Sequence, residues 1–204
     1  MKQFSVIASI AMILAACSAS KQAAAQKAPA EETAPATFRV NFDTSRGPFV
    51  VEIIREQAPH GADRFYNLVK AKYFDGSRFY RVVPGFMAQW GAAADPAVSR
   101  KWDIPIPDDP VQGTNERGTI SFAASSAPNS RTTHMFINFG DNARLDAMGF
   151  APLGKVVSGM ETVDQIYSGD GENPDQTQIK EEGNAYLEKQ FPNLDYIKTA
   201  RLAQ

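Results

Sequence analysis

The stretch FYRVVPGFMAQWG, from Phe79 to Gly91, carries the strongest information on the fold of this chain. Its first residues alternate as in a short β-strand, which predicts Phe79, Arg81 and Val83 on one face. Pro84-Gly85 then supplies a fixed φ followed by a conformationally permissive residue, which is typical of a turn. The pattern predicts a strand, a turn and a strand, with the charged guanidinium of Arg81 on an apolar face. Such a guanidinium must either extend to solvent or line a polar pocket in an apolar wall.

The composition of the whole chain is that of one globular domain. Its 204 residues are 43% hydrophobic and 22% charged, which is enough apolar material for a sizeable core. The formal net charge of −2 gives no reason to expect a nucleic-acid partner. Two well-separated histidines, one cysteine and the lack of a Gly-rich phosphate loop indicate neither metal nor nucleotide chemistry. We therefore expect no cofactor.

The first residues have the features of an export signal. In MKQFSVIASIAMILAAC a lysine precedes an apolar run, Phe4 to Ala16, that is shorter than a membrane-spanning helix requires. The sequence LAAC, ending at Cys17, resembles the lipobox of bacterial lipoproteins, in which the cysteine becomes the lipidated N-terminus. We expect a lipoprotein signal peptide over residues 1–16 and an acyl anchor on Cys17; the alternative is an ordinary secretory signal. With either signal the chain is exported, and the lipobox predicts a membrane-anchored form in the cell envelope, facing the periplasm.

The next segment has the composition of a tether. Residues 18–36, SASKQAAAQKAPAEETAPA, contain no large apolar side chain and cannot form a packed core. We expect a disordered tether over residues 17–36 and a folded domain over residues 37–204.

Within that domain, short strands outnumber helices. A helical period of apolar residues predicts a helix near 59–71 and a shorter one near 159–166, and a third lies within 181–191. Residues 92–117, with prolines at 105, 107 and 110 and little periodicity, are expected to form a surface loop. Alternating apolar residues predict two strands within 36–56 and others near 118–125, 133–139, 149–159 and 195–202. This pattern favours an all-β barrel or sandwich with helical caps.

Three segments, in order, resemble the cyclophilin family of peptidyl-prolyl cis-trans isomerases. FYRVVPGFMAQWG is similar to the family motif F-H-R-[VI]-[IV]-P-G-F-M-x-Q-G-G. Residues 118–139 (GTISFAASSAPNSRTTHMFINF) and 145–166 (LDAMGFAPLGKVVSGMETVDQI) resemble two further family segments. The resemblance implies a mainly β fold, a closed eight-stranded antiparallel β-barrel capped by two α-helices. The helices near 59–71 and 159–166 would be those caps.

The activity implied by the resemblance is acceleration of rotation about X-Pro bonds. Amide resonance sets a barrier of ~18–20 kcal/mol, and no bond is broken, so the enzyme must bind the twisted amide better than either planar isomer. The prolyl nitrogen regains a lone pair in the twisted state, and a rigid, always protonated donor aimed at it stabilises that state. The family assigns this role to its motif arginine, which matches Arg81.

The resemblance also implies the rest of the site. Gln89 would bond the substrate carbonyl or orient Arg81, and His134 stands where the family has a glutamine that contacts the substrate backbone. An unperturbed imidazole there would titrate near ~6.5. The apolar slot for the proline ring and the walls of the peptide groove are assigned to Phe86, Met87, Phe136, Ala123, Ala124, Leu145 and Phe150.

Four departures from the family pattern bear on the pocket and on the loop after Gln89. His134 replaces a family glutamine, Phe150 replaces a histidine and Arg144 replaces a tryptophan. Trp90 replaces a glycine, and this change predicts different packing of the loop after Gln89. These departures leave two alternative functions open. One is a chaperone module that holds proline-containing segments with little turnover, and the other is a scaffold with a degenerate site. We expect a monomeric, membrane-tethered isomerase that acts on proline-containing unfolded or exported polypeptides.

Overall fold

Alternation of apolar and polar residues builds the first strand pair. In β1 (Thr37–Thr44), Phe38, Val40 and Phe42 are buried between exposed neighbours. A tight turn leads to β2 (Gly47–Ile54), which pairs with β1 antiparallel along its whole length. The rings of Phe42 and Phe49 stack with their centroids 4.6 Å apart, so this cross-strand pair forms one wall of the core.

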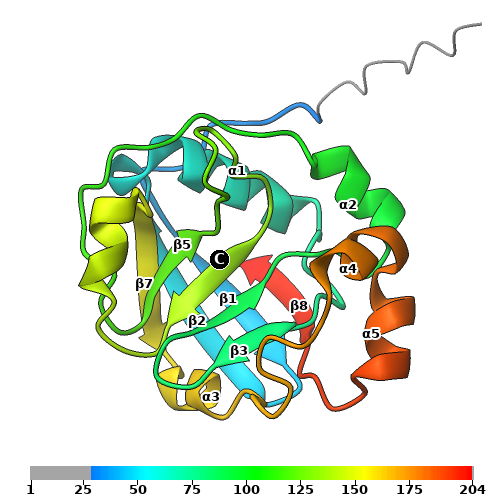
Figure 1. Ribbon diagram of the computed structural model, residues 1–204. Helices are drawn as coiled ribbons and strands as arrows, with labels where there is room; N and C mark the ends of the chain where they lie inside the picture. Colours follow the sequence, from blue (N-terminus) through cyan, green and yellow to red (C-terminus); the bar gives the residue numbers. More distant parts are fainter. Residues whose placement is uncertain (1–28, 204) are drawn as a thin grey trace, which may run out of the picture.

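The computed structural model describes residues 29–203, in which eight antiparallel strands form one curled sheet (Figure 1). The order of the strands is β3-β4-β6-β5-β7-β2-β1-β8. The remaining strands are β3 (Arg81–Val83), β4 (Met87–Trp90), β5 (Thr119–Phe122), β6 (Met135–Asn138), β7 (Pro152–Ser158) and β8 (Ile197–Leu202). Each strand expected from the sequence is present, and the mainly β class is confirmed.

The expected closure of the barrel is not confirmed. β3 and β8 are the edges of the sheet, and in residues 29–203 no ladder of strand pairs joins them. The seam contains one isolated bridge, between Arg78 and Tyr196, and backbone hydrogen bonds such as Ile197 N to Ser77 O at 2.8 Å. The sheet is therefore an open, curled half-barrel. It stays open because β3 has only three residues and irregular backbone faces β8.

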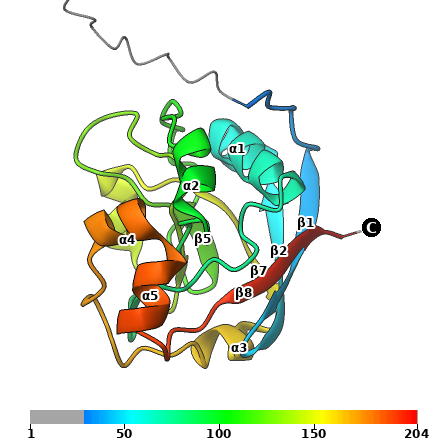
Figure 2. The same ribbon diagram turned by 90° about the vertical axis from the view of Figure 1, so that its right-hand side faces the viewer.

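The two predicted cap helices lie at opposite ends of the sheet (Figures 1 and 2). α1 (Pro59–Lys70) begins with a proline, which lacks only an N–H that the first turn leaves unpaired. Its apolar face, which includes Phe65 and Leu68, is buried against the sheet. α3 (Met160–Asp164) closes the other end through Val163. Short 3-10 turns at Arg55–Gln57 and Ala143–Met148 complete the connections.

Three further helices lie on one flank of the molecule (Figure 2). α2 (Pro96–Trp102) corrects the expected surface loop: the Asp95 carboxylate accepts a hydrogen bond from Ala97 N at 2.8 Å and caps it. The expected single tail helix is two helices, α4 (Gln176–Glu182) and α5 (Asn184–Gln190). They are separated at Gly183, which has a positive φ of 60° and leaves no room for a Cβ beside Ala94 O.

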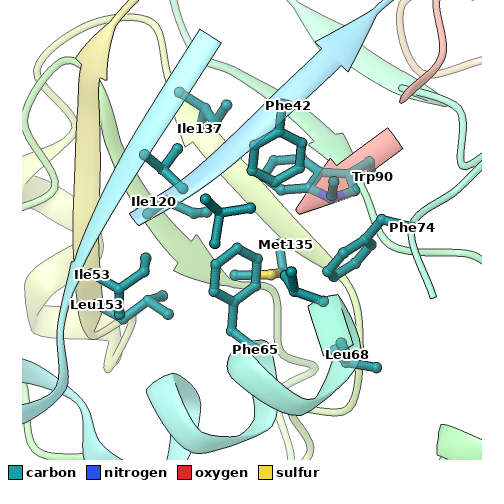
Figure 3. Packing of buried hydrophobic residues seen from close by; sticks show 14 of the residues in the cluster. Phe42, Ile53, Phe65, Leu68, Phe74, Trp90, Ile120, Met135, Ile137 and Leu153 are labelled. Carbon is teal, nitrogen blue, oxygen red and sulfur yellow. The ribbon is translucent and has the colours of Figure 1, made fainter. Parts of the chain in front are cut away.

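The core fills the concave side of the sheet under α1 (Figure 3). Trp90 is fully buried in this core and meets Phe42, Phe74 and Phe79 edge-on, with ring centroids 5.7 to 6.4 Å away. From the sequence, Trp90 was expected in a loop after Gln89. In the structure Trp90 is instead the last residue of β4. Phe79 also lies in this core, whereas Arg81 does not. The predicted common face of these two residues is wrong because the regular strand begins only at Arg81.

Several sequence-based expectations lie outside the described residues. The signal peptide over residues 1–16, the lipidated Cys17 and the first part of the tether belong to this group. Within residues 29–203, no helix combines the length and apolar character needed to cross a membrane.

The described end of the tether packs on the domain. Ala34 is buried, and its N–H donates to Asp63 Oδ1 at 2.8 Å. The Glu31 carboxylate pairs with Arg64 at 2.8 Å, and the Arg64 side chain is only 3% exposed. Contact between the chain and α1 therefore begins before Thr37, where the domain was expected to start.

Candidate active site

A pocket of about 380 Å³ lies on the face of β3, β4 and β6 that points away from the core. The residues that the family resemblance implies are gathered around it, although they come from four separate parts of the chain. These residues are Arg81, Phe86, Met87, Gln89, Ala123, Ala124, His134, Phe136, Leu145 and Phe150.

Strand register explains how the central side chains meet. Arg81 on β3 is paired with Gln89 on β4, and Gln89 is paired with Phe136 on β6. Paired residues on neighbouring antiparallel strands project to the same side, so these three side chains form a row across the pocket. The alternate residues Val82 and Ala88 point to the core instead. The row therefore joins a cation, an amide and an aromatic ring.

The apolar part of the pocket is a slot with an aromatic wall. Met87, Phe136 and Leu145 are each 5% exposed or less and pack together as a small cluster separate from the main core. Phe150 meets Phe136 edge-on with ring centroids 5.8 Å apart, so it supplies an aromatic wall where the family has a histidine. Arg144 lies over the Phe86 ring, 4.7 Å from its centroid, at the rim. The slot suits a small saturated ring.

Arg81 lines this slot and does not extend freely into solvent. Its Nη1 donates to Gln89 Oε1 at 3.1 Å and lies 3.9 Å from Met87 Sδ. Its Nε donates to Glu172 Oε1 at 2.7 Å. The guanidinium carbon is 5.9 Å from the centroid of the Phe86 ring. A permanently charged, planar donor is thus held at the edge of an apolar slot.

A hydrogen-bonded series continues from Arg81 into the protein. Arg81 can only donate, so the amide oxygen of Gln89 faces Arg81 and its Nε2 donates to Tyr80 Oη at 2.9 Å. Tyr80 Oη lies 2.7 Å from His134 Nδ1. Among the described residues Nδ1 is the only other hydrogen-bond partner of Tyr80 Oη, so the phenol hydrogen is directed to Nδ1. The His134 ring is therefore neutral, with its proton on Nε2.

Burial accounts for the protonation state of this series. Desolvation lowers the pKa of His134 to about 4, so the expectation of titration near ~6.5 is corrected. Desolvation also raises the pKa of the Tyr80 phenol well above its ordinary value, so the hydroxyl keeps its proton. The groups that continue the hydrogen-bonded series behind Arg81 are therefore neutral.

The lowered pKa of His134 makes a difference in stability between the parent and His134→Gln measurable. Below about pH 6.5 the unfolded chain binds a proton at this residue that the folded state rejects until about pH 4. The contribution of neutral His134 to the free energy of unfolding is therefore fully present above pH 6.5 and is lost as the pH falls towards 4.

We expect the parent to lose about 1 kcal/mol more free energy of unfolding than His134→Gln between about pH 7 and pH 5.5. Urea denaturation at both pH values measures this difference, since other titrating groups are common to both proteins. Equal pH dependence of the two proteins would contradict the buried neutral imidazole.

The structure adds pocket residues that the sequence did not single out. Their common feature is that they lie in loops or at helix ends: Ser125, Ser130, Thr132 and Gln176 line the pocket, and Glu172 bonds Arg81. The sequence does carry a signal for Tyr80. It replaces the histidine of the family motif, and its hydrogen-bond partner His134 also replaces a family residue. For Glu172 and Gln176 the sequence carries no comparable signal. No group of three or more potential metal-ligating side chains occurs in residues 29–203.

Comparison with known proteins agrees with this geometry. The family model described as cyclophilin type peptidyl-prolyl cis-trans isomerase/CLD matches residues 39–183, which include every residue that lines the pocket. A peptidyl-prolyl cis-trans isomerase of Acinetobacter baylyi is 36% identical over 136 residues, 64% of this chain and 72% of that protein. Peptidyl-prolyl cis-trans isomerase A of Dickeya dadantii is 36% identical over 145 residues, 69% and 76% of the two chains.

Solved structures show the same fold. A cyclophilin type peptidyl-prolyl cis-trans isomerase of Cryptosporidium parvum superposes with a TM-score of 0.63 at 21% identity, covering 82% of this chain and 98% of that one. The cyclophilin AquaCyp293 of Hirschia baltica gives a TM-score of 0.63 at 18% identity, covering 83% and 75%. At these identities the likeness concerns the fold.

Proposed function

Because the chain belongs to the family of cyclophilin-type peptidyl-prolyl cis-trans isomerases and is an enzyme of that activity, we propose that Arg81 stabilises the twisted amide of its substrate. The observation that supports this role is the position of a clamped guanidinium beside a slot of Phe136, Met87 and Leu145. Cyclophilins act on proline-containing peptides, and the slot accepts the proline ring. Comparison of isomerase rate with peptide affinity in an Arg81 variant tests the proposal.

The proposed step follows from the donor geometry. With the ring in the slot, rotation about the X-Pro bond makes the prolyl nitrogen pyramidal and gives it a lone pair. Glu172 and Gln89 occupy three of the five N–H groups of Arg81. The second N–H of Nη1 faces the weak acceptor Met87 Sδ at 3.9 Å, and the second N–H of Nη2 is left for a ligand. This N–H donates to the prolyl nitrogen, an interaction that a planar amide cannot make.

Two neighbouring elements hold the rest of the peptide. The substrate backbone runs along Ala123 and Ala124, and the Nε2–H of His134 donates to a substrate carbonyl oxygen. Ala123 N–H already bonds His134 O at 2.8 Å, so that backbone segment is fixed before a peptide binds. A fixed groove lowers the entropy that binding must overcome.

We further propose that the enzyme is an exported lipoprotein that acts on unfolded exported proteins while tethered to a membrane. The support comes from residues 1–17, with their short apolar run and lipobox-like LAAC, and from the polar tether that follows. The acyl chain on Cys17 is the membrane contact. The net charge of −2 adds no attraction to anionic headgroups.

Replacement of Cys17 tests the anchor. In Cys17→Ala we expect unprocessed precursor and complete loss of labelling by a radioactive fatty acid, because the thiol is the site of acylation. Ser18→Ala, one residue further on, should be labelled like the parent. Labelling and fractionation of cells that produce each form are the measurements. Normal processing of Cys17→Ala would exclude the lipoprotein and leave an ordinary secretory signal.

A further inference from the structure

The loop between α3 and α4 lies against the outer edge of β3. Gly171 O accepts a hydrogen bond from Val82 N at 3.1 Å, although no strand in the described part of the chain pairs with β3 on this side. The loop turns back at this point through a bond from Gly171 N to Ser168 O at 3.1 Å. The contact satisfies a backbone donor of an edge strand and brings Glu172 next to Arg81, one residue from Val82.

Glu172 completes a clamp around the Arg81 guanidinium. Its Oε1 accepts from Arg81 Nε at 2.7 Å and also pairs with Nη2 of the same fork. On the opposite side Arg81 Nη1 donates to Gln89 Oε1 at 3.1 Å. Two partners on different nitrogens fix the plane of the guanidinium, whereas one partner leaves it free to rotate about the contact.

The contribution of this pair to stability is expected to be small. The Arg81 and Glu172 side chains are 29% and 61% exposed, and solvent screens such a pair. The effect of Glu172 on the orientation of Arg81 is expected to be larger. Without Glu172, the bond to Gln89 and the contact with Phe86 would be left to hold the flexible Arg81 side chain in the pocket. The pair therefore acts on geometry more than on folding.

The loop that carries Glu172 is attached at both ends. Tyr167 N donates to the buried Asp195 Oδ2 at 2.7 Å, and Asp195 also accepts from Arg46 Nε at 2.7 Å. At the other end Asp175 N donates to Tyr186 Oη at 3.1 Å. Gln176, directly after the loop, lines the pocket. Glu172 is consequently presented to Arg81 from a fixed backbone.

We propose that Glu172 is a positioning residue that orients Arg81 towards the prolyl nitrogen of the substrate. This inference rests on the proposed function, in which Arg81 is the donor. Glu172 does not touch the substrate in this scheme; it holds Nε and Nη2 so that the remaining N–H of Nη2 points into the slot. An inhibitory role, in which Glu172 competes with the substrate for Arg81, predicts the opposite change in rate.

Substitution of Glu172 separates these roles. In Glu172→Ala we expect kcat to fall about tenfold with KM within about twofold of the parent, because the donor is misaligned while the slot is intact. Glu172→Gln keeps an oxygen acceptor at the same reach and should recover most of the lost rate. Glu188→Ala is the matched control, since Glu188 pairs with Arg78 at 3.1 Å and is similarly exposed, but lies outside the pocket.

A double-mutant cycle distinguishes failure of this inference from failure of the proposed function. In an Arg81→Ala background, Glu172→Ala should change kcat no further, because its effect passes through Arg81. A parental or increased kcat in Glu172→Ala, a further loss in the double variant, or no recovery by Glu172→Gln would overturn the positioning role. A parental kcat in Arg81→Ala alone would instead overturn the proposed role of Arg81.

Discussion

Arg81→Ala is expected to lower kcat/KM by about two to three orders of magnitude, which corresponds to the ~2.7–4 kcal/mol typical of removing one transition-state donor. The loss falls on the chemical step because the donor meets a lone pair that exists only in the twisted amide. Affinity for a proline-containing peptide should change little, since Met87, Phe136 and Leu145 still form the slot. A protease-coupled isomerase assay and a peptide-binding titration on the same protein measure the two quantities.

Two control variants sharpen this experiment. Arg81→Lys should recover little of the rate, because an ammonium on a flexible stem cannot bond Gln89 and Glu172 while it also donates to substrate. Arg39→Ala removes an arginine of an exposed pair with Glu52 on the far strands and should leave the rate unchanged. All proteins should contain residues 18–204, which include every residue that the structure describes.

The comparison of rate with affinity also tests whether the enzyme uses the Arg81 cation. A folded Arg81→Ala variant with a rate close to that of the parent would remove Arg81 from the mechanism. If the peptide affinity of that variant were also unchanged, the pocket would bind proline segments without using its cation.

The strands and the cap helices were predictable because their signals are local. In β1 the buried residues Phe38, Val40 and Phe42 alternate with exposed ones, so burial on one face of a sheet is visible in the sequence. The apolar stripe of α1 is visible in the same way. Closure of the barrel is not a local property. It depends on how β3 meets β8, which are more than a hundred residues apart, and the structure leaves that seam open.

The ten implied site residues lie around one pocket, and strand register places the central three. Arg81, Gln89 and Phe136 come from neighbouring strands, and a motif that specifies those strands also specifies their common face. Glu172 comes from a loop whose position depends on a single bond to Val82 and on distant attachment to Asp195. Such contacts leave no periodicity or motif in the sequence, so sequence reasoning did not reach them.

Trp90 shows how a family comparison misjudges a residue whose role is in packing. The motif has glycine at this position, so the comparison alone would rate Trp90→Gly as a return to the family pattern. In the structure the buried indole packs edge-on against Phe42, Phe74 and Phe79. Figure 3 shows it beside Phe42 and Phe74. Its Nε1–H is buried with no hydrogen-bond partner among residues 29–203, so the indole contributes by packing.

Trp90→Gly is therefore expected to lower the free energy of unfolding by about 3–5 kcal/mol, since it leaves a cavity that the rigid sheet cannot fill. Glycine inside β4 adds roughly 0.5–1 kcal/mol through backbone entropy. The midpoint of thermal unfolding should fall by about 10 °C or more. Trp90→Phe, which keeps an aromatic ring in contact with Phe42 and Phe79, should lose much less. Circular dichroism on the three proteins measures the change, and a parental midpoint in Trp90→Gly would mean that Trp90 does not support this core.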